Sequence, residues 1–286
     1  MLYYKIIAPT VKYVLHLYIK RLGVEGLENI PTDKPVLFAA THSNSFLDAL
    51  FVTTSLGYPV YAMARGDAFD KPFVNKVLTD LRMLPIYRLT DGDQDSVKKN
   101  EVTFNKTIDL FRKNQKVLIF PESFCKHQTS LLILKKGIGV MAHTAWSEGI
   151  PLHIVPVGIT YNGFNIFGNK CDIIFGKPIV QNDIKDMTNV MSAWQSLGSK
   201  LTADMKAIFP SQRNFQTPID WGFWSQIYYY LGWIFNFPIY LLAMFLAKKL
   251  TKGTVFYDSA VVGIISLSLL VYWPILILIA SIYLFF

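Results

Sequence analysis

The sequence predicts a single α/β domain with a mostly parallel sheet flanked by helices, an amphipathic helix before it and a hydrophobic membrane tail after it. Three observations carry this prediction. Apolar runs alternate with helical patterns between residues 23 and 215, the first 22 residues mix apolar and basic side chains without an acid, and charges nearly vanish beyond residue 216. Strands that alternate with helices are typical of parallel sheets. The predicted units are therefore residues 1–22, 23–215 and 216–286.

Composition excludes several classes of protein. Of the 286 residues, 52% are hydrophobic and 17% are charged, whereas ordinary globular domains carry about 25% charged residues. Such a chain is neither disordered nor a coiled coil. The formal net charge is +8, and a basic surface attracts nucleic acid, anionic lipid or phosphorylated small molecules. Because an apolar tail accompanies this charge, we expect a membrane partner and no nucleic acid.

The pattern of residues 1–22 predicts an amphipathic helix. Its cations recur too often for a signal peptide or a spanning segment; they are Lys5, Lys12, Lys20 and Arg21. Apolar and Tyr side chains between these cations favour a helix that lies in the membrane interface. The alternative is a helix whose apolar face packs against the core of the domain.

Short apolar runs predict the strands of the sheet. These runs are residues 36–40, 58–64, 83–88, 117–120, 154–159 and 172–175. Apolar side chains at helical spacing predict helices over residues 96–114, 136–147 and 183–209. The order of these elements indicates an α/β sheet in which most neighbouring strands run parallel.

The tail contains two apolar stretches, residues 227–247 and 259–286. At ~1.5 Å per residue, each stretch is long enough to cross a ~30 Å hydrocarbon core. Each stretch also carries a central proline, Pro238 or Pro274, so two bent helices that dip into one leaflet are the alternative. The connection between them carries three lysines, Lys248, Lys249 and Lys252. The domain is basic as well and competes with these lysines for the cytoplasmic side, and we expect the domain to face the cytoplasm. Whether the two stretches span the bilayer or dip into one leaflet stays open.

His42 and Asp48 are the candidate catalytic residues. The strand at 36–40 leads directly into His42, and ligands of open parallel sheets bind beyond the carboxyl ends of the strands. A carboxylate near a histidine can fix its tautomer and stabilise the imidazolium. Six residues of continuous helix would turn the two side chains about 240° apart, so they meet only if the helix begins near Asn44 or Ser45. The alternatives are a capping box at Ser45-x-x-Asp48 and a structural histidine in the core.

Three further segments place functional side chains at strand ends. Arg88 closes the apolar run 83–88 and offers a planar fork suited to phosphate. Glu122 follows the buried run 117–120 after a proline, and Pro156 interrupts the apolar run 154–159. Each of these segments alone is weak evidence of a site.

Taken in order, the four segments resemble the glycerophospholipid acyltransferase family, which includes 1-acylglycerol-3-phosphate acyltransferases. The family pattern is a His-x4-Asp block, a strand ending in Arg, a Phe-Pro-Glu-Gly block and an apolar block with a central proline. Residues 24–31 and 132–137 are also similar to the family, and the resemblance runs from about residue 20 to 215.

The resemblance implies transfer of a fatty acyl group from an acyl thioester to the hydroxyl of a lysophosphatidate-like acceptor. His42 would remove the hydroxyl proton and Asp48 would orient the imidazole, without metal, cofactor or acyl-enzyme. The implied substrate-binding residues are Arg88 for the acceptor phosphate, Glu122, Ser123 and Lys126 around the acceptor, and Pro156 in the wall near the thioester. Coenzyme A and acyl-carrier protein both remain open as carriers of the acyl donor.

The sequence departs from the family pattern at two points. The first block is His-x5-Asp, a spacing found in glycerol-3-phosphate acyltransferase-like members that have C-terminal membrane segments. In the third block Ser123 replaces the family glycine and the following Thr-Arg is absent, although Lys126 and His127 could supply charge nearby. Glycerol-3-phosphate and other lipid hydroxyls therefore remain alternative acceptors. A catalytically silent, membrane-anchored lipid-binding protein is the alternative of another class.

One further motif matches a cofactor fingerprint. Residues 137–142 read Gly-x-Gly-x-x-Ala, as in dinucleotide-binding loops. No acid lies about 20 residues further on, where a ribose partner is expected. We therefore expect these glycines to allow close packing of a helix.

Overall fold

The computed structural model describes residues 2–88, 95–166, 168–209 and 223–285. Its centre is a seven-stranded sheet in the order β1-β7-β6-β2-β5-β3-β4. All neighbouring strands run parallel except β6 and β7, which are antiparallel. The predicted fold class, a mostly parallel sheet flanked by helices, is therefore confirmed.

The elements follow one another in the order that the apolar pattern predicts, with a strand at residues 19–25 and a helix at residues 72–80 in addition. The strands are β1 (Ile19–Glu25), β2 (Val36–Ala40), β3 (Tyr61–Arg65), β4 (Met83–Ile86), β5 (Lys116–Ile119), β6 (His153–Tyr161) and β7 (Asn169–Phe175). The helices are α1 (Leu2–Tyr18), α2 (Phe46–Ser55), α3 (Pro72–Asp80), α4 (Ser96–Arg112), α5 (Gly137–Ser147), α6 (Val190–Ile208), α7 (Phe223–Thr251) and α8 (Tyr257–Phe285).

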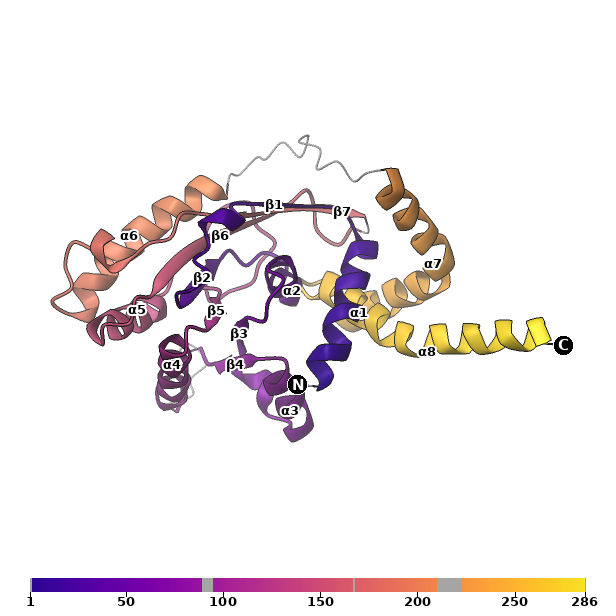
Figure 1. The fold of residues 1–286 in the computed structure, drawn as a ribbon, viewed down its shortest axis with the longest axis horizontal. Coiled ribbons are helices and arrows are strands. Elements are labelled where there is room, and N and C mark those ends of the chain that lie inside the picture. The colour runs from indigo at the N-terminus through magenta and orange to yellow at the C-terminus, as the bar shows by residue number, and fades with distance from the viewer. Residues whose placement is uncertain (1, 89–94, 167, 210–222, 286) are drawn as a thin grey trace.

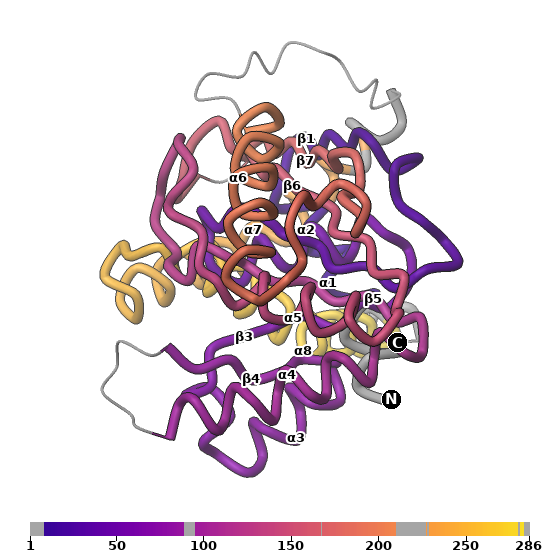
Figure 2. The backbone as a smooth tube through the Cα atoms, turned by 90° about the vertical axis from the view of Figure 1, so that its left-hand side faces the viewer, coloured from indigo at the N-terminus to yellow at the C-terminus, as the bar shows by residue number. Residues whose placement is uncertain are grey.

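The sheet separates two layers of helices. Strand β2 lies in the middle of the sheet and all five of its residues are buried. Alternate side chains of β2 enter two separate cores, one shared with α1, α2, α7 and α8 and the other with α4, α5 and α6. Figure 1 shows these two groups of helices on opposite sides of the sheet, and Figure 2, seen from one side, shows α5 and α6 in front of it.

Strand β1 is a correction to the prediction for residues 1–22. The predicted helix ends at Tyr18, and residues from Ile19 onward form an edge strand parallel to β7. Arg21 of this strand is 9% exposed and pairs with Asp172 of β7 at 3.3 Å. The buried ion pair allows a cation to occupy an inward position of the strand.

Helix α1 packs against the protein over the part whose side chains are described. Val14, Leu15, Leu17 and Tyr18 are at most 4% exposed, while Tyr13 on the other face is 45% exposed. The helix contacts α2, α3, α7 and α8. Its apolar face is thus in the core here, which is the second of the two alternatives that the sequence left open.

Helices α7 and α8 correspond to the two predicted apolar stretches. Both continue through their central prolines, and Figure 1 shows α7 bent along its length and α8 extending away from the domain. A span of 23 residues in each is long and apolar enough to cross a membrane, and only 28% and 17% of an apolar 18-residue window in the two spans is buried. A core helix of a soluble protein would be mostly buried. The two helices therefore expose a large apolar surface, which could anchor the chain in a membrane.

The connection between α7 and α8 lies beside the soluble domain. The backbone oxygen of Gly253 is 3.5 Å from the side-chain nitrogen of Asn165, and Asp258 at the start of α8 contacts three segments of the domain. Near its other end, α7 brings Gly232 against Leu17 of α1. Both ends of α7 thus contact the same domain. The predicted boundary near residue 215 lies outside the described residues.

Candidate active site

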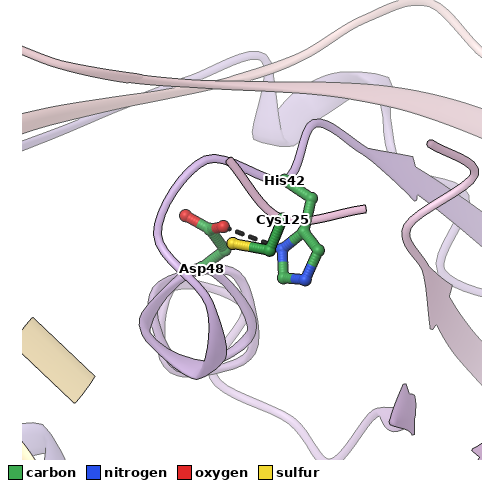
Figure 3. Close-up of side chains that lie close together, drawn as sticks. All are labelled: His42, Asp48 and Cys125. Carbon is green, nitrogen blue, oxygen red and sulfur yellow. Dashed lines mark hydrogen bonds and ion pairs between the residues drawn. The ribbon is translucent and has the colours of Figure 1, made fainter. Parts of the chain in front are cut away.

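His42 and Asp48 meet at the carboxyl end of β2. His42 lies in the loop after β2, α2 begins at Phe46, and Asp48 lies in the first turn of that helix. The Nδ1 atom of His42 is 2.9 Å from Oδ2 of Asp48, and Figure 3 marks this contact with a dashed line. The wide rotation expected along a continuous helix does not arise, because the chain turns at Ser45 with φ 53° before the helix starts.

Asp48 is fully buried and accepts three hydrogen bonds. Besides His42, its donors are the backbone N–H of Asn44 at 2.8 Å and the hydroxyl of Tyr161 at 2.6 Å. Burial, reinforced by the charge of Asp48, raises the pKa of Tyr161 far above its ordinary value, so Tyr161 remains a donor. These three donors replace the water that a buried carboxylate has lost. Ser45 makes no side-chain capping bond in the described structure, so the capping-box alternative does not account for Asp48.

The imidazole of His42 is held in one orientation. Because a carboxylate only accepts, Nδ1 carries the proton of the contact with Asp48 and Nε2 is left as the basic nitrogen. Phe120 stacks on the ring with centroids 4.1 Å apart and planes 19° apart. The His42 side chain is 19% exposed, and Figure 3 shows Nε2 directed away from Asp48. Such a nitrogen can take a proton from a bound hydroxyl.

The loop after β5 closes over the same edge of the sheet. The backbone N–H of Lys126 donates to the oxygen of His42 at 3.4 Å, and the N–H of Ser45 donates to the sulfur of Cys125 at 2.8 Å. Ser123 has φ 60°, a left-handed conformation that glycine adopts without strain. The backbone shape typical of a glycine is thus present although the residue is serine.

Glu122 and the charged residues around it occupy different environments. Glu122 is 1% exposed, accepts a hydrogen bond from Gln128, and burial raises its pKa to about 7. Lys126 is exposed. His127 stacks on Phe164 at 4.2 Å and burial lowers its pKa, so it supplies little positive charge near neutral pH.

Arg88 lines an open cavity next to this loop. The cavity has a volume of about 220 Å³. Its charged lining residues are Arg65, Arg88 and Lys99 together with Asp67 and Asp70, and Arg65 pairs with Asp67. The Arg88 guanidinium lies 4.6 Å from the ring centroid of Phe124, two residues beyond Glu122. Asn100 of α4 bonds both the N–H and the oxygen of Tyr87, which fixes the chain immediately before Arg88.

Pro156 is not brought to the site. Strand side chains alternate between the faces of a sheet, and Val155 and Val157 point into the core beside α2 whereas Ile154 points into the core beside α6. Pro156 therefore lies on the face opposite to that of Asp48. A Cβ atom built on Gly176 would lie 3.5 Å from the Pro156 Cβ and 3.4 Å from Ile208. On this face Pro156 packs under α6, and its predicted place near the thioester stays a prediction.

Cys125 brings a thiol close to the histidine and the aspartate. Ligand atoms of His42, Asp48 and Cys125 all lie within 4.8 Å of one another, so these three residues are the group that could hold a metal ion among those described. His42 and Asp48 already bond each other, and a cation would have to break that bond. Burial raises the pKa of Cys125 to about 12, which keeps the thiol protonated and weakly nucleophilic.

Sequence reasoning missed four residues that shape the site. Tyr161 ends a strand at the same sheet edge as His42, and that position was the available signal. Asp258 was visible as a lone acid in an apolar tail. Phe120 and Asn100 reach the site through tertiary contacts, which no local sequence pattern predicts.

The structure is thus that of an α/β protein with a His–Asp pair at the carboxyl edge of its sheet, in which Nε2 of His42 is the nitrogen that can accept a proton. Residues 21–160 match the family model described as Acyltransferase. Residues 21–160, about half of the chain, therefore form a domain of the acyltransferase family.

Relatives that are named as acyltransferases also match part of the chain. The chain is 29% identical over 154 residues to lysophosphatidylcholine acyltransferase 1 of Rattus norvegicus and of Homo sapiens. It is 25% identical over 139 residues to a chloroplastic 1-acyl-sn-glycerol-3-phosphate acyltransferase of Arabidopsis thaliana. These matches span 54% and 48% of this chain but only 25% and 37% of the relatives.

The crystal structure of the 1-acyl-sn-glycerophosphate acyltransferase PlsC from Thermotoga maritima shares the fold. The TM-score is 0.51 with 17% sequence identity, over 71% of this chain and 77% of that one. This likeness concerns the arrangement of the sheet and its helices.

Proposed function

We propose that this protein transfers a fatty acyl group from an acyl thioester to the hydroxyl of a lysophosphatidate-like acceptor in phospholipid synthesis. The observation that carries the proposal is the 2.9 Å contact between His42 Nδ1 and Asp48 Oδ2, which leaves Nε2 as the basic nitrogen. Family membership supports the same chemistry, since the relatives are named as acyltransferases for lysophospholipids.

In the proposed reaction His42 acts as the general base. Its Nε2 takes the hydroxyl proton while the acceptor oxygen attacks the thioester carbonyl carbon. The buried carboxylate of Asp48 stabilises the imidazolium through Nδ1–H. The intermediate then expels the thiolate, which leaves with the proton returned by His42. The protonated thiol of Cys125 favours this direct route over an acyl-cysteine.

The acceptor site is proposed on the side of Arg88. A phosphate in this cavity would meet Arg88 and Lys99, while Arg65 already pairs with Asp67, and Arg88 offers a bidentate fork. Glu122, Ser123 and Lys126 lie in the loop between this cavity and His42. They are the residues proposed to shape the acceptor site.

We place the protein at a membrane with its catalytic domain facing the cytoplasm. Exposed apolar side chains of α7 and α8 would lie in lipid, close to substrates that partition there. The basic connection between the two helices contacts the domain rather than lying far from it, so both basic parts are on one side, as the positive-inside rule requires. This contact favours the leaflet-dipping topology for α7.

Acyl transfer by the purified full chain in lipid vesicles tests the proposal. One labelled fatty acyl-CoA, and separately the acyl-carrier-protein thioester, is offered with lysophosphatidate, glycerol-3-phosphate, lysophosphatidylcholine or an aminolipid. We expect labelled phosphatidate from lysophosphatidate. His42→Ala should lower kcat about 10²–10⁴-fold while membrane association persists, and Cys125→Ser should retain activity.

Two results would reject the mechanism. One is acyl transfer that persists in folded, membrane-bound His42→Ala. The other is a labelled acyl-protein thioester that disappears in Cys125→Ser together with activity. Arg88→Ala should raise the KM for the phosphate acceptor and leave that for the thioester unchanged, whereas the surface variant Arg112→Ala should alter neither value. Thioester turnover that no acceptor stimulates would favour the silent lipid-binding alternative.

A further inference from the structure

Asp258 is a buried carboxylate supplied by the apolar tail. It is the sole acidic residue beyond position 221 of the sequence, it lies in the first turn of α8, and it is 0% exposed. A carboxylate at a helix start is commonly a surface feature that interacts with the helix dipole. Complete burial costs several kcal/mol unless partners replace water, so the partners of Asp258 explain its presence.

Three segments of the domain donate hydrogen bonds to Asp258. The hydroxyl of Tyr18 in α1 lies 2.6 Å from Oδ1. The side-chain nitrogen of Asn44 lies 2.7 Å from Oδ2, and the backbone N–H of Asn165 lies 3.1 Å from the same oxygen. Asn165 has φ 58°, a left-handed conformation that a non-glycine residue rarely adopts. The donors come from outside α8, so this carboxylate ties the tail to the domain.

Asn44 connects this cluster to the catalytic pair. Its side chain donates to Asp258 while its backbone N–H donates to Asp48 at 2.8 Å. Asn44 itself is fully buried. The next residue of the tail repeats the arrangement: the hydroxyl of Ser259 accepts the N–H of Leu47 at 3.1 Å and lies 3.4 Å from the Asn44 oxygen. The start of α8 therefore holds the loop between His42 and Asp48 from one side.

We propose that Asp258 is a positioning residue that fixes the His42–Asp48 loop through Asn44, so that the membrane tail completes the active site. The proposal rests on the acyl-transfer function given above. An asparagine at position 258 has one acceptor oxygen in place of two and no charge, so the three hydrogen bonds cannot all be kept. The Asn44 side chain is then held less firmly, and so is the backbone N–H that orients Asp48. His42 then spends less time aimed at the acceptor hydroxyl, although both catalytic side chains remain present.

The test compares Asp258→Asn with Asp172→Asn in the full chain in vesicles. Asp172 is a matched control because it is also a carboxylate with 2% exposure, but it pairs with Arg21 at the sheet edge. For Asp258→Asn we expect kcat to fall about 10–100-fold, as for other groups that orient catalytic residues, with an unchanged KM for the thioester. Asp172→Asn should retain kcat.

A double-mutant cycle and hydrogen exchange separate positioning from general stability. Asn44→Ala keeps the backbone N–H to Asp48 and, on the proposal, mimics Asp258→Asn; the double variant should be no worse than either single one. Amide exchange in residues 41–48 should be faster in Asp258→Asn than in Asp172→Asn.

Additive losses in the cycle, or a KM increase in place of the kcat loss, would overturn the proposal. Exchange of residues 41–48 that is unchanged in Asp258→Asn would also overturn it. This exchange measurement does not depend on acyl transfer, so it still decides the positioning role if the wild-type protein acylates none of the acceptors and the proposed function fails.

Discussion

Glu122 has a carboxyl group that is almost completely buried. Its side chain is 1% exposed, and burial raises its pKa from an ordinary 4.5 to about 7. Between these two values the folded protein binds a proton that the unfolded chain has released. Folding is therefore linked to pH, and unfolding becomes easier as the pH rises through this interval.

Glu122→Gln should remove this dependence. The unfolding free energy of the wild type is expected to fall by up to about 3 kcal/mol relative to the variant between about pH 4.5 and 7, and to stay level above that. Urea unfolding in detergent micelles at several pH values measures the difference. The exposed Glu101→Gln is the control and should follow the wild-type curve. Parallel curves for Glu122→Gln and wild type would contradict the buried, proton-linked state.

At the residue scale the sequence predicted side chains that the fold brings together, but not all of their partners. His42, Asp48 and Glu122 could be predicted because each follows a buried strand, and such positions meet at one edge of a parallel sheet. The face on which Pro156 lies depends on the alternation within β6 rather than on its distance from the strand end. Asn44 could not be assigned, since its partner Asp258 is set by a tertiary contact.

At the scale of elements, the Gly-x-Gly-x-x-Ala segment has a packing role. Gly139 of α5 lies so close to α6 that a Cβ atom built on it would be 2.8 Å from the Trp194 ring. Gly139→Ala should therefore destabilise the protein by about 1–3 kcal/mol, although alanine is the better helix former. Thermal unfolding of the domain measures this. Gly263→Ala in α8, where the added carbon meets no atom within 4 Å, should not lower the Tm. A Gly139→Ala variant as stable as wild type would contradict tight packing.

Most elements could be predicted because their apolar periodicity reflects burial on one face or both. Strand β1 could not be predicted, because one of its inward positions is charged. Its inward positions include Arg21, and a cation there contradicts the apolar alternation unless its partner Asp172 is known. The preceding helix pattern of α1 also runs into the strand without a glycine or proline to mark the boundary.

At the scale of the whole molecule, exposed apolar residues gather on α7 and α8. Leu267, in the middle of the apolar part of α8, is 71% exposed. If this surface lies in lipid, Leu267→Arg should weaken membrane insertion, because a central charge costs about 2.5–3.5 kcal/mol. Val102→Arg in α4 is the matched control, since Val102 is 68% exposed on the other layer of helices.

Alkaline carbonate extraction of membranes measures this effect. The wild type and Val102→Arg should stay in the membrane pellet, while a larger share of Leu267→Arg should be released. Equal retention of both arginine variants would show that the α8 surface does not lie in the hydrocarbon region.

The distance along the chain between Asn44 and Asp258 has a consequence for biosynthesis. The two residues are 214 positions apart, and ribosomes add about 5–20 residues per second. For roughly 10–40 s, each nascent polypeptide therefore contains His42 and Asp48 but not yet Asp258. On the proposed positioning role, acyl transfer would reach its full rate only after α8 has been made and packs against the domain.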